Sequence, residues 1–265
     1  MQRSDLPRVV DAAWLRAHLA EEDLVVGDVR GPNAHMRGHI PGSRPLVLGS
    51  PPPGADANAL ADLAKEVALR LRRHGITGGE RLVLVDRGDG MGAMPAAQMA
   101  ELAGHPRVAV LVGGIAAWDG ELADGAVELE PVREASLEPN LLALPTRQEL
   151  ASRLDDPALT ILDVRREEEY NGKRGSACDP RQGHIPGARR VQVDTLFDPS
   201  GLPLPPDEIR ALVGEPEGAE IVAYCHSGSR SALATLALRS AGYETRNYAG
   251  SWHEWSRYDE LPIER

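Results

Sequence analysis

The sequence predicts an α/β protein made of two tandem domains, each with a mainly parallel sheet flanked by helices. The chain has 265 residues, which is long for one average domain and suits two of roughly 130 residues each. Short apolar runs rich in branched side chains alternate with helical stretches, the order expected of a parallel sheet covered on both faces. One series of motifs occurs twice along the chain, so we expect two copies of one domain.

The repeat starts with a buried strand that leads into Asp-Val-Arg. These strands are predicted at Leu24–Asp28 and Leu159–Asp163, and each is followed by the pentapeptide Gly-His-Ile-Pro-Gly, at 38–42 and 183–187. Both copies carry the same aspartate, arginine and histidine. We therefore interpret these polar groups as parts of the scaffold and look for the chemistry where the two copies differ.

A second strand and a helix follow in each copy. The apolar runs 82–86 and 221–225 predict buried strands, and the helices after them are expected to end just before Gly104 and Gly242. Glycine suits the position after a helix because it adopts left-handed backbone conformations without steric cost. Strand, helix and glycine turn thus recur in the same order in both halves.

The join between the copies is predicted at residues 126–144, an acidic stretch with scattered prolines and no clear periodicity. It separates a domain at 1–125 from a domain at 145–265. The second domain is expected to open with a helix, because Thr146 and Glu149 have the spacing of a capping box.

Composition and charge exclude several classes of function. The net charge of −11 argues against a nucleic-acid partner, which would need a basic face. No stretch approaches the ~20 apolar residues that span a bilayer, and the amino-terminal segment lacks the apolar core of a signal peptide. Two cysteines, Cys178 and Cys225, are too few for a disulfide framework. We therefore expect a cytoplasmic protein without membrane or nucleic-acid partners.

The predicted chemistry lies in the loop between the strand that ends near residue 224 and the helix that starts near Ser231. This loop consists of Cys225, His226, Ser227, Gly228, Ser229 and Arg230. Unpaired N–H groups of the first helical turn and the charge of Arg230 favour an anion at its centre. The same environment favours the thiolate of Cys225, which is the nucleophilic form. A cysteine at a strand end can also be a small buried hydrophobe, but the small residues and the closing arginine favour a reactive site.

The duplicated Asp-x-Arg and Gly-His-Ile-Pro-Gly motifs, the loop 225–230 and the carboxyl-terminal Gly-Ser-Trp-His-Glu-Trp at 250–255 together resemble the rhodanese family. The resemblance covers nearly the whole chain. It implies tandem rhodanese-like domains and ping-pong transfer of sulfane sulfur through a cysteine persulfide. It also implies that Cys225 carries the sulfur and that residues 226–230 bind the substrate.

The first copy departs from the family's catalytic pattern. Alignment of the strands 82–86 and 221–225 places Asp86 opposite Cys225. A carboxylate cannot carry sulfane sulfur and would repel an anionic donor. We therefore expect the first domain to be non-catalytic.

The predicted activity is that of a thiosulfate sulfurtransferase acting on a small anionic donor, with cyanide, a thiol or a thioredoxin-like protein as acceptor. A 3-mercaptopyruvate sulfurtransferase is the alternative, because Ser227 fits that pattern while Arg230 does not. Glu169 precedes Tyr170 where thiosulfate relatives have an arginine. The resemblance therefore predicts no donor contacts outside the loop. Two further alternatives are a sulfur carrier without turnover and a cysteine-based phosphatase, although phosphatases use a longer loop than the four residues between Cys225 and Arg230.

No metal or cofactor is predicted. The histidines do not cluster in the sequence with the two distant cysteines, and no phosphate-binding or dinucleotide-binding glycine motif occurs. Cys178 falls in 171–182, within an insertion of about ten residues relative to the first copy, and is interpreted as a free loop thiol; a redox partnership with Cys225 is the weaker alternative.

Overall fold

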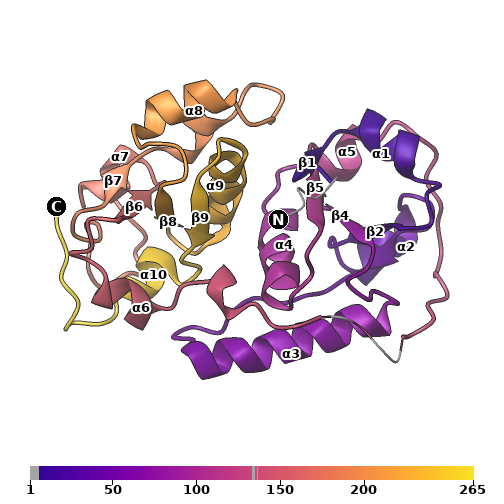
Figure 1. Cartoon of the computed structure of the whole chain (residues 1–265), viewed down its shortest axis with the longest axis horizontal. Coiled ribbons are helices and arrows are strands. Elements are labelled where there is room, and N and C mark those ends of the chain that lie inside the picture. The colour runs from indigo at the N-terminus through magenta and orange to yellow at the C-terminus, as the bar shows by residue number, and fades with distance from the viewer. Residues whose placement is uncertain (1–5, 133–134, 136) are drawn as a thin grey trace. The chain divides into compact units, whose positions relative to one another are not determined.

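The computed structural model describes residues 6–132, 135 and 137–265, so part of the predicted linker and residues 1–5 lie outside the described residues (Figure 1). The chain divides into two compact units, Met1–Ser50 with Ala61–Leu141, and Pro51–Leu60 with Leu142–Arg265. Among the described residues, no helix has both the length and the apolar character that crossing a membrane requires.

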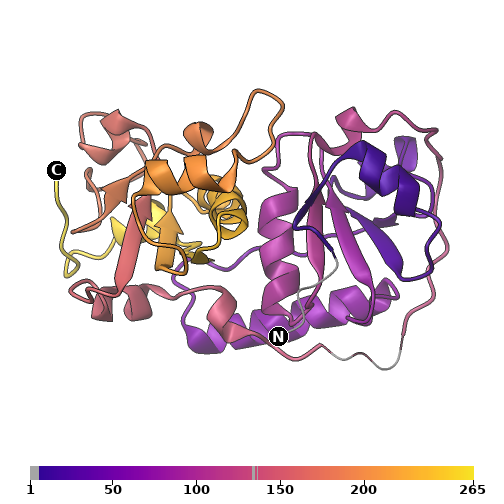
Figure 2. The same ribbon diagram turned by 45° about the horizontal axis from the view of Figure 1, so that its top comes forward.

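The first unit contains a five-stranded sheet in the order β1-β5-β4-β2-β3, and every neighbouring pair of its strands runs parallel. Helix α4 runs alongside its strands in both views of the ribbon (Figures 1 and 2). The elements in chain order are β1 Val9–Val10, α1 Ala12–His18, β2 Leu24–Asp28, α2 Pro32–Arg37, β3 Arg44–Pro45, α3 Ala57–Arg73, β4 Arg81–Val85, α4 Ala93–Leu102, β5 Val108–Leu111 and α5 Gly114–Ala117.

The second unit has a four-stranded sheet in the order β7-β6-β8-β9, again with parallel neighbours. The remaining elements are η1 Leu141–Ala143, α6 Arg147–Ser152, β6 Leu159–Asp163, α7 Glu167–Tyr170, β7 Arg189–Arg190, η2 Val193–Leu196, α8 Pro206–Val213, β8 Glu220–Tyr224, α9 Ser229–Ser240, β9 Glu244–Asn247 and α10 Ser251–Trp255. Its strand order matches β3-β2-β4-β5 of the first sheet, so the predicted α/β fold with two copies is confirmed.

Two predicted strands lie one residue earlier than expected. Strand β4 ends at Val85 and β8 ends at Tyr224, so Asp86 and Cys225 are the first residues of the loops that follow. In the register of the second sheet, Tyr224 is paired with Asp163. Cys225 therefore lies just past the carboxyl end of a central strand, the edge at which open parallel sheets bind ligands.

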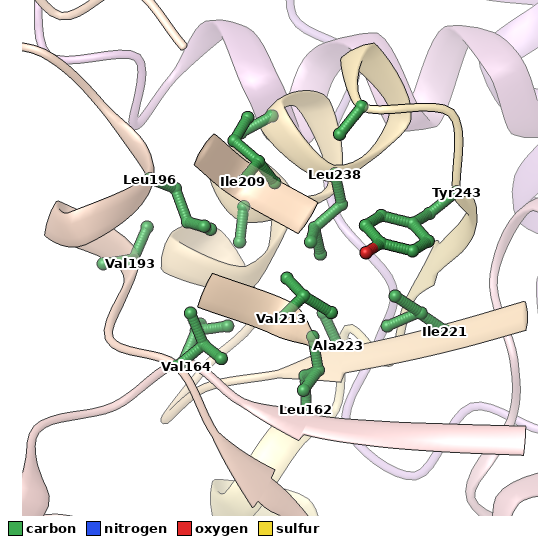
Figure 3. Close-up of a cluster of buried hydrophobic side chains, with 14 of the residues drawn as sticks. Leu162, Val164, Val193, Leu196, Ile209, Val213, Ile221, Ala223, Leu238 and Tyr243 are labelled. Atoms are coloured by element: carbon green, nitrogen blue, oxygen red, sulfur yellow. The ribbon is translucent and has the colours of Figure 1, made fainter. Parts of the chain in front are cut away.

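Alternate residues of the central strands face two separate cores in the second unit. Leu162, Ile221 and Ala223 contribute to one core, into which Ile209 and Leu238 pack from the helices α8 and α9 (Figure 3). The intervening strand residues contribute to the other core, together with side chains of α6 and α10. Cys225 continues the first series, and its position places the thiol on the α9 side of the sheet.

The predicted helix ends are confirmed. Gly104 and Gly242 both have a φ of +92° directly after the caps of α4 and α9. At the start of α6, the Thr146 side chain accepts a hydrogen bond from the N–H of Glu149 at 3.1 Å. The Glu149 carboxylate forms an ion pair with Arg246 at 2.6 Å, so only this half of the expected capping box is found.

The duplicated polar motifs have the scaffold role that the repeat predicts. The guanidinium of Arg165 binds the Asp163 carboxylate through two nitrogens and also donates to the carbonyl of Gly183 at 2.7 Å. Arg30 binds Asp28 and the carbonyl of Gly38 in the same way in the first unit. These bonds connect the end of a central strand to the Gly-His-Ile-Pro-Gly turn in each copy.

Candidate functional site

The loop 225–230 comprises the connection from β8 to α9 and the first two residues of α9, which begins at Ser229, two residues earlier than predicted. Helix α10 packs against this loop. The N–H of Trp252 donates to the carbonyl of Cys225 at 3.0 Å, and the N–H of His253 donates to the carbonyl of His226 at 2.8 Å. Two carbonyls of the loop are thereby occupied on the side of α10. The N–H groups of Ser229 and Arg230 belong to the first turn of α9, where no intrahelical acceptor exists for them.

The Cys225 side chain is buried and has hydrogen-bond donors from the loop and from α9 beside its sulfur. The residue is 1% exposed, and its Sγ accepts the N–H of Gly228 at 3.1 Å. The Ser231 hydroxyl lies 3.4 Å from Sγ and 3.1 Å from the carbonyl of Gly228, so its single hydrogen can serve either acceptor. Both donors lie at the start of α9, where N–H and O–H groups and the helix dipole can hold an anionic sulfur atom.

Gly228 gives the loop its shape. Its φ of +91° lies in the left-handed region, and a Cβ at this position would lie 2.5 Å from the carbonyl oxygen of Ala249. The side-chain amide of Asn247 donates to the Gly228 carbonyl at 3.0 Å and fixes its orientation. The N–H of Gly228 therefore points at the sulfur only because the residue has no side chain.

Ser251 is a part of the site that the sequence reasoning missed. It is fully buried, and its hydroxyl oxygen accepts the N–H of Cys225 at 3.1 Å. Its φ of +55° makes it the one non-glycine residue with positive φ in the described chain. The corresponding residue of the first copy is Gly114, with a φ of +51°. A serine in place of glycine at a left-handed position, only in the copy that has the cysteine, is the signal that could have identified it.

Arg230 does not stand alone at the end of the loop. Its two terminal nitrogens donate to the two carboxylate oxygens of Glu169 at 2.9 and 2.8 Å. Burial acts to raise the pKa of Glu169, but the hydrogen bonds and the charge of Arg230, together with the backbone N–H of Arg166 and the charge of Arg165, lower that pKa overall. The same bonds raise the pKa of Arg230. The pair is thus intact at neutral pH and is lost only when the pH falls through the lowered pKa of Glu169.

This pairing changes the expected role of Arg230. The sequence suggested that its full charge would be available to an anionic donor. The bidentate ion pair partly compensates that charge. Backbone N–H groups of the loop therefore carry a larger share of anion binding than the sequence indicated.

The remaining loop residues lie near the surface of the second unit. The Ser227 side chain is exposed. His226 is half-buried, and its Nε2 lies 3.1 Å from the Asp179 carboxylate and 3.9 Å from Sγ of Cys178. Cys178 belongs to the insertion and is free and exposed, as predicted. The proximity of Cys178 to His226 was not predicted, because 48 residues separate the two in the sequence.

Asp86 has the equivalent position in the first unit. Its carboxylate accepts the N–H groups of Gly88 at 2.9 Å and of Gly92 and Ala93 at 3.1 Å each. The N–H of Ile115 donates to the carbonyl of Asp86, as that of Trp252 does to Cys225. The aspartate is 3% exposed and occupies, with its own side chain, the donors that would otherwise face an anion.

Comparison with known proteins agrees with this geometry. The family model described as the rhodanese-like domain matches the chain twice, at residues 11–121 and 146–258. The chain belongs to the rhodanese family. Both matched ranges contain the strand, loop and helix described above, and Cys225 lies in the second.

Several relatives match over almost their full length. A thiosulfate sulfurtransferase of Azotobacter vinelandii is 32% identical, with 98% of each chain covered. A probable 3-mercaptopyruvate sulfurtransferase of Pseudomonas aeruginosa is also 32% identical, with 97% of each covered. Among solved structures, a probable thiosulfate sulfurtransferase is 32% identical and superimposes with a TM-score of 0.71 over 92% of this chain and 98% of its own. The predicted rhodanese-family membership is confirmed.

Proposed function

We propose that the chain is a thiosulfate sulfurtransferase. In the first half-reaction, the Cys225 thiolate attacks the outer sulfur of thiosulfate, the S–S bond breaks, and sulfite leaves with the bonding electron pair. A thiophilic acceptor such as cyanide or a thiolate then attacks the persulfide sulfur, and the Cys225 thiolate is regenerated. The observation that carries this proposal is the buried Sγ of Cys225, which accepts the Gly228 N–H and has the Ser231 hydroxyl within 3.4 Å. The names of the full-length relatives support it.

The size of the loop favours sulfur over a phosphoryl group. Four residues separate Cys225 from Arg230, and the Gly228 N–H already contacts Sγ itself. A cradle this short suits one additional sulfur atom and is tight for a tetrahedral oxyanion. The loop therefore favours sulfur transfer over phosphatase activity. A carrier without turnover would use the same persulfide, and multiple turnovers in a cyanide assay would separate the enzyme from the carrier.

We further propose that residues 1–125 form a non-catalytic domain, that 126–144 link the domains and that 145–265 form the catalytic domain. The two ranges matched by the family model fall within these bounds. The Asp86 carboxylate supports the non-catalytic role, because it satisfies the loop donors that a persulfide would use. A cytoplasmic location completes the proposal and is consistent with two cysteines that are both free.

The 3-mercaptopyruvate alternative gains support from one observation. Because Glu169 compensates Arg230, the loop offers less charge to a dianion than its sequence suggests. A donor with a single carboxylate and a carbonyl would lose less from this pairing, and the Ser227 hydroxyl could polarise the carbonyl. Initial rates with thiosulfate and with mercaptopyruvate, measured side by side, decide between the two. We expect the higher specificity constant with thiosulfate.

Glu169→Gln is expected to lower the KM for thiosulfate by several-fold, because the charge of Arg230 is no longer compensated. This change corresponds to a binding free energy on the order of 1 kcal/mol. The effect should weaken with increasing salt concentration. Steady-state kinetics at two ionic strengths measures both. Glu168→Gln is the matched control, because this neighbouring carboxylate is exposed and its loss should leave KM unchanged. An unaltered KM in the folded Glu169→Gln variant would show that the pair does not influence donor binding.

Arg230→Ala is expected to reduce kcat/KM for thiosulfate by about tenfold or more, since a hydrogen bond to a charged group contributes ~1.5–3 kcal/mol. The loss should exceed that for mercaptopyruvate, because Glu169 is then unpaired beside the loop and repels the dianion more strongly. Arg230→Lys should restore only part of the activity, because a lysine ammonium cannot reproduce the bidentate contact that Arg230 makes with Glu169. Equal losses for both donors would contradict this account of donor selection.

A further inference from the structure

A second cluster of reactive side chains includes His226, the residue that follows Cys225 in the chain. It consists of Cys178, Asp179, His226 and His253, whose ligand atoms all lie within 4.8 Å of one another. Two of the residues come from the insertion, one from the loop 225–230 and one from α10. We propose that these four side chains form a Zn²⁺ site. Thiolate and imidazole are the ligands that zinc prefers, and a carboxylate oxygen completes its usual coordination number.

The distances between the ligand atoms resemble the edges of a zinc tetrahedron. Zinc bonds of ordinary length give edges of roughly 3.6 Å between sulfur and nitrogen and roughly 3.3 Å between nitrogen and oxygen. Sγ of Cys178 lies 3.6 Å from Nδ1 of His253 and 3.9 Å from Nε2 of His226. The Asp179 carboxylate oxygens lie 2.9 Å from the former nitrogen and 3.1 Å from the latter. All four ligand atoms lie within 4.8 Å of one another, so the side chains must draw together to share one ion.

The Asp179 carboxylate gives independent support. Its side chain is 1% exposed, and its Oδ2 has no hydrogen-bond partner among the described residues. A buried carboxylate oxygen without a donor is costly, and Nε2 of His226 lies nearby without forming a regular hydrogen bond. The charges also balance, because a dication is neutralised by one thiolate and one carboxylate.

One cation already lies at the edge of the cluster. Nη1 of Arg257 is 3.1 Å from Nδ1 of His253 and 3.4 Å from Oδ1 of Asp179, and its Nη2 donates to the carbonyl of Cys178. The Ser176 hydroxyl lies 2.9 Å from Sγ of Cys178. Binding of zinc requires Arg257 to withdraw from the His253 nitrogen, and the thiol and Nδ1 must release their protons. Arg257 is partly exposed and can move towards solvent.

This cluster could not be predicted from the sequence. Cys178 and Asp179 are adjacent, but His226 and His253 follow 48 and 75 residues after the cysteine. The first copy lacks the insertion, so comparison of the two copies does not indicate the cluster either. A bound ion would connect the insertion to the loop 225–230 and to α10. Cys225, which carries the sulfur in the proposed function, belongs to the same loop.

Titration of the full-length reduced protein with zinc chloride tests the proposal, with Co²⁺ as the optical probe. We expect one equivalent of Zn²⁺ to bind at least as tightly as ~1 µM. Cobalt should give the intense absorption of a tetrahedral thiolate complex. Cys178→Ser and His253→Gln should each weaken zinc binding by at least ~100-fold, since loss of an outer-shell partner alone costs 10–100-fold.

Two variants serve as controls. Cys225→Ser should bind zinc as the wild type does, and His18→Gln repeats the histidine substitution in the first unit, where it should have no effect. Zinc should raise the melting temperature of the wild type but not of Cys178→Ser, whose fold is checked by circular dichroism. Absence of stoichiometric binding would overturn the proposal. Binding that survives Cys178→Ser and is lost in Cys225→Ser would also overturn it, because the ion would then be held by the catalytic thiol.

Discussion

Cys225→Ser should lose sulfurtransferase activity by at least ~10³-fold, down to the level of the uncatalysed reaction. A serine hydroxyl cannot form a persulfide, and every step of the proposed cycle passes through that sulfur. The substitution is nearly isosteric in a site that is 1% exposed, so the fold should be retained. Release of thiocyanate from thiosulfate and cyanide measures the activity, and circular dichroism with thermal melting measures the fold.

The other cysteine supplies the matched control for this experiment. Cys178 is exposed, and Cys178→Ser should keep most of the activity when it is assayed without added metal. Loss of activity in both variants would indicate that the two thiols act together, as in a redox pair. Loss in Cys178→Ser alone would refute the assignment of Cys225 as the nucleophile.

Gly228→Ala is expected to reduce kcat/KM by about 10²-fold, although the residue has no reactive group. The added Cβ would meet the carbonyl of Ala249 at 2.5 Å, and the φ of +91° is unfavourable for alanine. The loop must move to relieve both, and its N–H then no longer points at Sγ of Cys225. We also expect a loss of ~1–3 kcal/mol in the free energy of unfolding. Steady-state kinetics and denaturant titration measure the two effects.

Gly218→Ala is the control that separates backbone strain at a positive φ from the steric contact with Ala249. Gly218 has a φ of +83°, close to that of Gly228, but no atom lies within 4 Å of a Cβ built there. It should cost about 1 kcal/mol of stability and leave the activity unchanged. If Gly228→Ala behaves in the same way, the geometry of the loop is not what activates the thiol.

The fold could be predicted from the sequence because its signals are local and occur twice. The strands ending at Asp28 and Asp163, the paired Gly-His-Ile-Pro-Gly turns and the glycines after α4 and α9 each depend on neighbouring residues only. The predicted ends of β4 and β8, at Asp86 and Cys225, were one residue too late. Both side chains are buried, and burial alone does not distinguish the last residue of a strand from the first of a loop.

The site was predicted only in part, because much of it depends on contacts between distant residues. Cys225 and the loop up to Arg230 are contiguous, and their sequence was sufficient. The ion pair of Arg230 joins residues 61 apart, and the bond from Cys225 to Ser251 joins residues 26 apart. Nothing in the local sequence of either pair specifies its partner. Contacts of this kind follow from the register of β6 and β8 and from the packing of α10, which only the three-dimensional structure shows.

Mass spectrometry of the protein after incubation with thiosulfate tests the central claim most directly. The protein is alkylated, digested and mapped before any acceptor is added. We predict the mass of one additional sulfur atom on the peptide that contains Cys225, removable by a thiol and absent from Cys225→Ser. Sulfur on the Cys178 peptide alone, or no added sulfur on either peptide, would contradict the proposal that Cys225 carries sulfur as a persulfide.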